Sequence, residues 1–306
     1  MTNLTQSPLV SDSTDTSETR VTAGASLRAR AWRRFRRHKL AMVGLVYIVL
    51  VTLMALAAPL LVGHDPTKIN PRNSYSAPSA DHPLGTDLAG RDVWARLVYG
   101  TRVSLAVGLV SVSISLAITM VLGTLAGYYG GAVDMIIMRF TDVVMVFPGL
   151  VLIIAVVSVV GPSIFNVMAV LGILGWTGTT RLLRAQILSV RELDYVVAAR
   201  ATGVPDWRIM WEHVLPNSIA PLLVSATFGV AGAILTEAGL SFLGLGVLPP
   251  TPSWGSMLNA ANSMTVMERN WWMWIPPGIA LLLSVMAINF AGDGLRDALD
   301  PRTEMR

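Results

Sequence analysis

The chain has 306 residues, of which 53% are hydrophobic and 14% are charged. Soluble domains carry about 25% charged residues, so this composition excludes a water-soluble fold of this length and favours a membrane protein. The net charge of +4 comes from arginines that flank apolar segments, which indicates membrane topology and argues against a nucleic-acid partner. The absence of cysteine excludes disulfides and thiolate metal sites.

The N-terminal segment is expected to stay in the cytoplasm. Residues 1–38 are predicted to form a basic tail, which is rich in Ser and Thr and disordered over residues 1–27. An uncharged run at 40–63 follows and is long enough to cross the membrane, which takes about 20 apolar residues. Basic residues mark the cytoplasmic side of a span, so residues 39–100 are predicted to hold the first transmembrane helix and an exterior segment.

Further apolar runs predict five more spans. Residues 143–180 contain no charged residue, which is too long for one span, and Gly161-Pro162-Ser163 predicts a turn that divides them. The predicted spans are 103–127, 143–160, 164–180, 218–240 and 271–291. The fold class is therefore an all-α membrane protein with six transmembrane helices and cytoplasmic N- and C-termini. Residues 101–293 form its main transmembrane domain, and residues 294–306 form a cytoplasmic tail.

Enzymatic motifs are missing from the sequence. A phosphate-binding loop needs a lysine between Gly and Ser or Thr, whereas Lys39 follows His38 and Lys68 follows Thr67. The 4 histidines are far apart and have no metal-ligand spacing. We therefore predict no catalytic residue, no metal site and no ATP site on this chain, which leaves binding and movement of a substrate.

A charged segment at 181–216 interrupts the apolar pattern and is predicted to face the cytoplasm. Within it, Ala198, Ala199 and Ala201 give a helix with a face of small side chains, which Gly203 is expected to end. Such a face lets another protein approach the backbone closely, and the nearby arginines suit carboxylates on a partner. The residues alone favour a docking loop and an ordinary amphipathic loop equally.

The exterior segment contains a compact polar block, residues 82–105. We expect Asp87 to cap a short exterior helix, Asp92 and Arg96 to pair one turn apart, and Gly100 to end that helix before the second span. As an isolated pattern, the block predicts no more than a capped helix at the membrane interface.

Glu237 is the one acid within the fifth apolar run. Charged residues in spans are costly and often functional, which raises a role in proton or substrate movement. We favour instead an acid near the outer end of the span, paired across a subunit interface. Trp271, Trp272 and Trp274 cluster where the sixth span begins, and they predict an aromatic belt at the interface.

Two of these segments resemble a known family. Ala198-Ala199, Gly203 and Leu215-Pro216 resemble the loop of bacterial ABC importer permeases that inserts a coupling helix into the ATPase subunit, although Val197 stands where that family has Glu. The exterior block is similar to the C-type permease of dipeptide, oligopeptide and nickel importers. Three further blocks, 127–131, 240–255 and 292–302, fit the same family, so the resemblance covers about residues 30–302.

The resemblance implies a type I ABC importer permease fold, with 101–293 as the ABC permease domain. It implies an ATPase-docking loop formed by Tyr195, Ala198, Ala199, Arg200, Gly203, Leu215 and Pro216. It also implies an exterior motif formed by Gly85, Asp87, Gly90, Arg91, Asp92, Arg96, Tyr99 and Arg102. ATP and Mg²⁺ would then bind to partner ATPase subunits, and this chain would carry no cofactor.

The function implied is import of di- or oligopeptides across the bacterial plasma (inner) membrane by alternating access. The implied partners are a second homologous permease, two ATPase subunits or domains, an extracytoplasmic substrate-binding protein and the lipid membrane. Nickel, glutathione or haem are alternative substrates for the same architecture. A stand-alone secondary transporter is the alternative from a different class, and activity without any ATPase would favour it.

Overall fold

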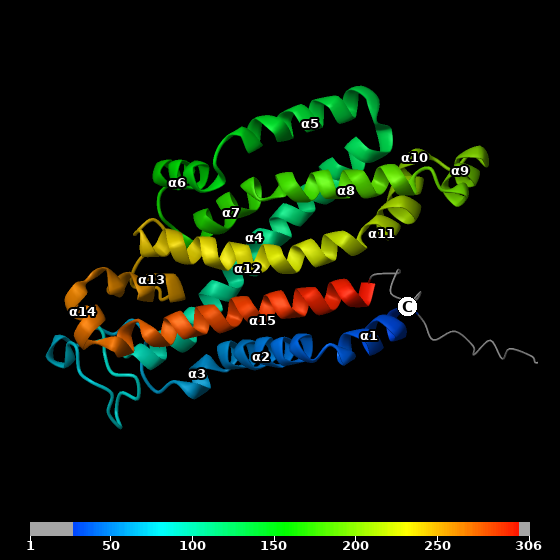
Figure 1. The fold of residues 1–306 in the computed structure, drawn as a ribbon. Coiled ribbons are helices and arrows are strands. Elements are labelled where there is room, and N and C mark those ends of the chain that lie inside the picture. Colours follow the sequence, from blue (N-terminus) through cyan, green and yellow to red (C-terminus); the bar gives the residue numbers. More distant parts are fainter. Residues whose placement is uncertain (1–26, 300–306) are drawn as a thin grey trace, which may run out of the picture.

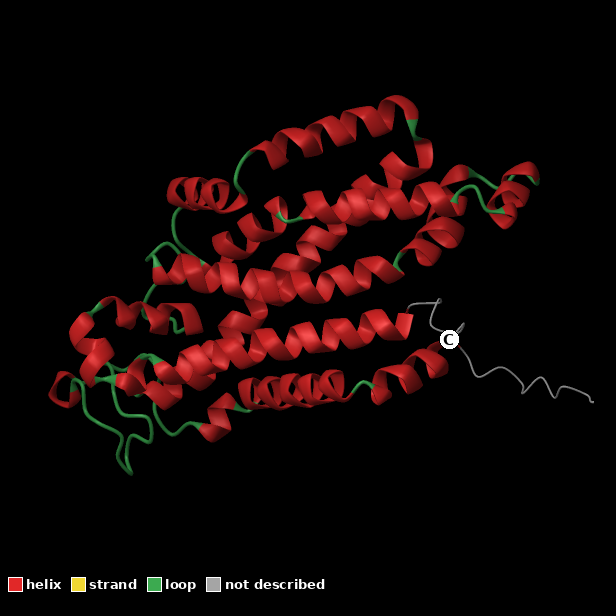
Figure 2. Ribbon diagram, viewed as in Figure 1, coloured by secondary structure: helices red, strands yellow, loops and turns green. Residues whose placement is uncertain are grey.

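The computed structural model describes residues 27–299, and the regular secondary structure in that part of the chain is helical (Figure 2). The tail predicted to be disordered, residues 1–27, lies outside the described residues except for its last position. The distal part of the predicted C-terminal tail, residues 300–306, lies outside them too.

Four helices in the described part are long and apolar enough to cross a membrane. They are α2 (Lys39–Leu56), α4 (Val93–Tyr129), α12 (Ala220–Phe242) and α15 (Ile275–Leu299). Their ranges overlap four of the predicted spans, at 40–63, 103–127, 218–240 and 271–291. Predicted and observed ends differ most for α4, which begins at Val93 because the second part of the exterior block already belongs to this helix.

The predicted span at 143–160 is a bent pair of helices. Helices α5 (Gly131–Val146) and α6 (Gly149–Val160) meet at 85° and pass the length and composition test only together, as one broken span or a re-entrant loop. The break falls at Phe147-Pro148, where Phe147 takes an extended conformation. A proline disfavours helical geometry in the residue before it, so the predicted span at 143–160 contains a break that the sequence prediction did not include.

The predicted turn at 161–163 is confirmed, since α7 (Ile164–Leu174) begins directly after it. No helix ends at residue 180, where the next span was predicted to end. Helix α8 (Trp176–Val190) follows α7 after Gly175 and continues through Arg181 and Arg184. Arginine is a good helix former, so these residues end the apolar run without ending the helix. Acids of α5 pair with them: Arg181 with Asp142, and Arg184 with Asp134.

Helix α4 lies at the centre of the bundle and packs against α7, α8 and α12, while α15 packs between α2 and α12 (Figure 1). Glycines allow the close contacts. A β-carbon at Gly127 would lie 2.8 Å from the Ile187 side chain, and one at Gly44 would lie 3.2 Å from the carbonyl carbon of Ala287. Close packing of small residues is a main source of helix association in membranes.

The shorter helices gather at the two ends of the bundle (Figure 1). One end, which we call the loop-rich end, holds residues 63–92 and 243–274. It includes α3 (Ala58–Leu61), α13 (Trp254–Leu258) and α14 (Met264–Arg269). The opposite end, the α9 end, holds α1 (Leu27–Arg37), α9 (Asp194–Ala201), α10 (Asp206–Arg208) and α11 (Leu215–Ser218). All the described site residues except Glu237 lie at or near one of these two ends.

Candidate functional site

Helix α9 projects from its end of the bundle and offers an exposed surface (Figure 1). One side chain, Val196, is fully buried and anchors the helix in the apolar core. On the other side, Tyr195 and Val197 are 43% and 50% exposed. Gly203 has a φ of +82° and follows the end of α9, so the predicted helix end is confirmed.

Only some of the predicted docking residues are exposed on this surface. Tyr195, Ala198, Arg200, Gly203 and Pro216 are exposed. Ala199 is partly buried, and Leu215 is buried in the core below the loop. Two residues outside the predicted set, Trp207 and Trp211, are 61% and 45% exposed. Large exposed apolar side chains of this kind mark a surface for a protein partner or a membrane.

The end of α4 holds this loop in place. The hydroxyl of Tyr128 donates a hydrogen bond of 2.7 Å to Asp206 Oδ1, and the guanidinium of Arg200 lies 5.5 Å from the centre of the Tyr128 ring. Arg191 donates from Nη1 to the carbonyl oxygens of Gly127 and Tyr128, at 2.9 and 3.2 Å. A charged group stacked on an aromatic ring and a hydrogen bond to a carboxylate both resist separation of the loop from α4.

The sequence prediction missed this connection. Tyr128, Arg191 and Asp206 were not among the predicted docking residues, because they lie on separate elements and only the fold brings them together. The block 127–131 was a signal that Tyr128 mattered, but spacing alone did not reveal its partner.

In the exterior block, Asp92 and not Asp87 caps the helix. Asp92 Oδ1 accepts a 2.6 Å hydrogen bond from the backbone N–H of Ala95, at the start of α4. The predicted pair between Asp92 and Arg96 was also wrong, since the other Asp92 oxygen contacts His82 Nδ1 at 2.8 Å. An N-cap residue has a non-helical backbone and turns its side chain toward its own helix, which removes it from the i,i+4 geometry.

Asp87 instead organises the turn before α4. Its Oδ1 accepts from the backbone N–H groups of Ala89 and Arg91, and its Oδ2 pairs with the side chains of Arg91 at 2.7 Å and Arg96 at 3.6 Å. Arg96 also donates to the carbonyl oxygens of Pro66 and Pro250. Positive φ values of 64° and 70° at Gly85 and Gly90 form the turn.

Gly100 was predicted to end a helix, and this prediction was wrong. It lies within α4, at a point where the backbone of Ser253 approaches the helix closely. Further along α4, Arg102 donates from Nη2 to the carbonyl oxygen of Leu56 at 2.8 Å, satisfying the end of α2. The same guanidinium lies 5.4 Å from the centre of the Tyr99 ring. The block therefore ties α2, α4 and the 249–253 loop into one unit.

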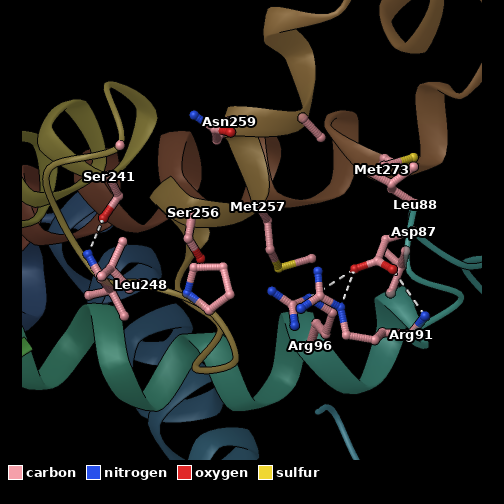
Figure 3. A pocket seen from close by; sticks show the side chains of 15 residues that line it. Asp87, Leu88, Arg91, Arg96, Ser241, Leu248, Ser256, Met257, Asn259 and Met273 are labelled. Carbon is pink, nitrogen blue, oxygen red and sulfur yellow. Dashed lines mark hydrogen bonds and ion pairs between the residues drawn. The ribbon is translucent and has the colours of Figure 1, made fainter. Parts of the chain in front are cut away.

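A cavity of about 230 Å³ opens beside this unit. Figure 3 shows Arg91 and Arg96 directed at the Asp87 carboxylate near Met257 and Met273, with Ser241 and Leu248 farther along the cavity. Because Asp87 already pairs with both arginines, the cavity presents no unpaired arginine to a ligand.

Glu237 is fully buried in this chain. Its Oε1 accepts hydrogen bonds from Ser241 at 2.7 Å and Ser253 at 2.8 Å, whereas its Oε2 has no hydrogen-bond partner among the described residues. These bonds connect α12 to the start of α13. A side chain with no exposed surface cannot contact another chain in this conformation, so the structure does not support the predicted pairing across a subunit interface.

The tryptophans predicted to form an aromatic belt at the membrane interface are not all exposed. Trp271 is 48% exposed, but Trp272 is buried and donates from Nε1 to the carbonyl oxygen of Thr86 at 3.2 Å. Trp272 therefore joins the loop 243–274 to the exterior block.

The fold and its two polar ends define an all-helical membrane protein with several spans. The chain belongs to the family of binding-protein-dependent transport system inner membrane components, whose model matches residues 119–305. A second model, the N-terminal transmembrane domain of oligopeptide transport permease C, matches residues 26–78. The chain is therefore a permease component of an ABC transport system.

Curated relatives resemble it over nearly their whole length. A putative peptide permease protein of Brucella suis biovar 1 is 44% identical over 93% of this chain and 94% of its own. The dipeptide transport system permease protein DppC of Alkalihalophilus pseudofirmus is 42% identical over 89% of each chain. The glutathione transport system permease protein GsiD of Pectobacterium atrosepticum is 42% identical over 89% of this chain and 90% of its own.

A solved structure shares the fold. An inward-facing structure of the MetNI methionine ABC transporter matches with a TM-score of 0.54 and 18% identity, covering 67% of this chain and 97% of that one.

Proposed function

We propose that this chain is one permease subunit of an ABC importer that carries di- or oligopeptides inward, with its α9 end docked on a separate ATPase. The observation that carries the proposal is α9 itself, an exposed helix fixed to the end of α4 through Tyr128. The peptide substrate is supported by the relatives named as peptide and dipeptide permeases. The glutathione permease among them makes a small peptide such as glutathione the second candidate.

We propose the partner subunits on the same family resemblance. A second homologous permease completes the pathway, two ATPase subunits or domains bind ATP and Mg²⁺, and an extracytoplasmic binding protein delivers substrate to the loop-rich end. This chain hydrolyses no ATP. The α9 end and both termini face the cytoplasm, as the arginines at 181–208 favour.

Six spans fit this orientation. In chain order, we assign the third span to the bent pair α5 and α6, and the fourth to α7 with α8, whose arginines pair with Asp134 and Asp142. An even number of spans keeps both termini on one side. Of the proposed division into 1–38, 39–100, 101–293 and 294–306, the first boundary falls between α1 and α2, whereas the second falls inside α4 and the third inside α15.

Helix α4 supplies a mechanical route between the two ends. It runs for 37 residues without a break, from the Asp92 cap to Tyr128. At 1.5 Å per residue such a helix is about 55 Å long, enough to span the bilayer and both interfaces. Movement of the docked loop would therefore reach the exterior block through one rigid element, and ATP binding would shift the population between inward- and outward-facing states.

Peptide uptake by the assembled complex in proteoliposomes tests this function. Ala198→Trp, on the exposed face of α9, should abolish uptake and binding-protein-stimulated ATP hydrolysis without preventing membrane insertion. Ser189→Trp, an exposed position of α8 outside the loop, is the matched control and should transport normally. Full stimulated hydrolysis by the Ala198→Trp complex would refute docking at α9, and uptake without any ATPase would refute the whole class.

A further inference from the structure

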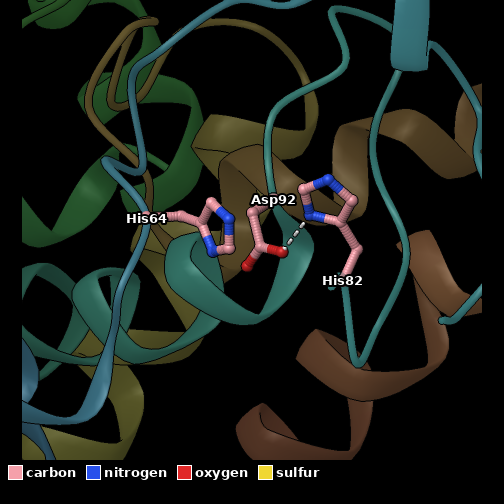
Figure 4. Close-up of side chains that lie close together, drawn as sticks. All are labelled: His64, His82 and Asp92. Carbon is pink, nitrogen blue, oxygen red and sulfur yellow. Dashed lines mark hydrogen bonds and ion pairs between the residues drawn. The ribbon is translucent and has the colours of Figure 1, made fainter. Parts of the chain in front are cut away.

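Three side chains that are candidate metal ligands meet at the loop-rich end. His64 follows α3, whereas His82 begins the exterior block and Asp92, ten residues later in the same block, caps α4. One ligand atom from each lies within 4.8 Å of the other two. Figure 4 shows the Asp92 carboxylate between the two imidazole rings, whose centres are 5.1 Å apart.

We propose that His64, His82 and Asp92 bind a divalent transition-metal ion of the zinc class. Imidazole nitrogen and carboxylate oxygen are the ligands that such ions take from proteins, at about 2.0 to 2.2 Å. Two ligands of one tetrahedral ion are then about 3.3 Å apart. His82 Nδ1 and Asp92 Oδ2 are 2.8 Å apart, so metal binding would separate them by about 0.5 Å, and the exposed His64 would have to bring its ring nitrogen closer.

The groups around the cluster suit metal ligation. The second oxygen of Asp92 is held by the Ala95 N–H, which fixes the carboxylate. The far nitrogen of the His82 ring, Nε2, lies 3.5 Å from the Asn73 side-chain amide, whose oxygen can accept its proton after an amide flip. Ligands in metal sites are oriented by outer hydrogen bonds of this kind.

Access and free coordination positions are present as well. His64 borders an open cavity of about 610 Å³, together with Asp65 and Thr67. An ion held by three protein ligands can complete its coordination there with water, as open zinc sites do.

A hydrogen bond between His82 and Asp92 is the simpler explanation, and it accounts for two of the three residues. It does not account for His64, whose imidazole makes a ring contact with His82 and no hydrogen bond among the described residues. A metal ion gives all three a role and joins the chain after the first span to the start of α4. This proposal does not depend on the identity of the transported substrate.

Metal binding to the full chain, purified in its complex without a histidine tag, tests the site. Calorimetry with Zn²⁺ and absorption spectra with Co²⁺ should reveal one ion per copy of this chain that is lost in the variants below, and the spectrum should carry the intensity of a tetrahedral site. His64→Ala should lower the affinity by at least about tenfold. His213→Ala, which removes a histidine at the opposite end, is the matched control and should bind like the unmodified chain.

Asp92→Asn serves as a second variant because its amide oxygen can still accept the Ala95 N–H while the carboxylate charge is lost. It should also weaken Zn²⁺ binding, and its thermal unfolding in the absence of metal shows whether the fold survives loss of the charged contact with His82. Equal Zn²⁺ binding by the unmodified, His64→Ala and Asp92→Asn chains would overturn the proposal, as would the absence of any Zn²⁺ bound by the unmodified complex. Since binding is measured directly, failure of transport does not affect the result.

Discussion

Removing the Tyr128 hydroxyl should loosen the connection between the docking loop and α4. Tyr128→Phe keeps the ring beneath Arg200 and removes only the 2.7 Å hydrogen bond to Asp206. A hydrogen bond to a charged group contributes about 1.5 to 3 kcal/mol, and the exposed position of Asp206 places this one at the lower end. A loss of about 1.5 kcal/mol changes the ratio of attached to detached loop by roughly tenfold.

Peptide uptake per ATP hydrolysed, measured with the complex in proteoliposomes, reports this loss. The Tyr128→Phe complex should insert normally and hydrolyse ATP with several-fold less uptake per ATP. Limited proteolysis within 194–208 should also become faster. Tyr129→Phe is the control because Tyr129 is 50% exposed and contacts the Tyr128 ring edge-on. If both variants match the unmodified complex in uptake and proteolysis, the hydrogen bond does not hold the loop and the reasoning fails.

Two further changes test the packing of the bundle. Gly127→Ala places a methyl group 2.8 Å from the Ile187 side chain and should destabilise the fold by about 1 to 3 kcal/mol, seen as a lower thermal unfolding temperature in detergent. Gly232→Ala, with no atom within 4 Å of the added methyl, should leave that temperature unchanged, and equal effects would contradict the close approach of α4 and α8. Glu237→Ala should cost about 1 to 3 kcal/mol because Ser241 and Ser253 lose their acceptor. Glu237→Gln keeps an acceptor oxygen and should be closer to the unmodified chain; the reverse order would exclude the proposed hydrogen-bonding role.

Apolar run length predicted the four described helices that are long and apolar enough to cross a membrane without interruption. It did not predict the bend at Phe147-Pro148, because run length measures burial in lipid and not backbone geometry. It also placed the end of one span before Arg181, since a charge normally ends a lipid-facing run. The acids that neutralise Arg181 and Arg184 come from α5, and only the tertiary fold brings them near.

The candidate sites were predictable to different degrees. The end of α9 at Gly203 depends on local conformation and was predicted correctly. The partners of Asp92 and Arg96 depend on segments far away in sequence, including Pro66 and Pro250, and were predicted wrongly. For the same reason, the scattered histidines predicted no metal site, whereas the fold brings His64 and His82 together. Residue spacing finds candidate ligands on one element, but it does not reveal side chains that meet only through the fold.

Protection of α9 by the ATPase is the most direct test of the central proposal. The chain contains no cysteine, so Ala198→Cys introduces a single thiol on the exposed face of the helix. The account predicts rapid maleimide labelling of Ala198→Cys in the permease without its ATPase and strong protection in the complete complex. Ser189→Cys should label at the same rate in both. Equal labelling of Ala198→Cys with and without the ATPase would contradict the account.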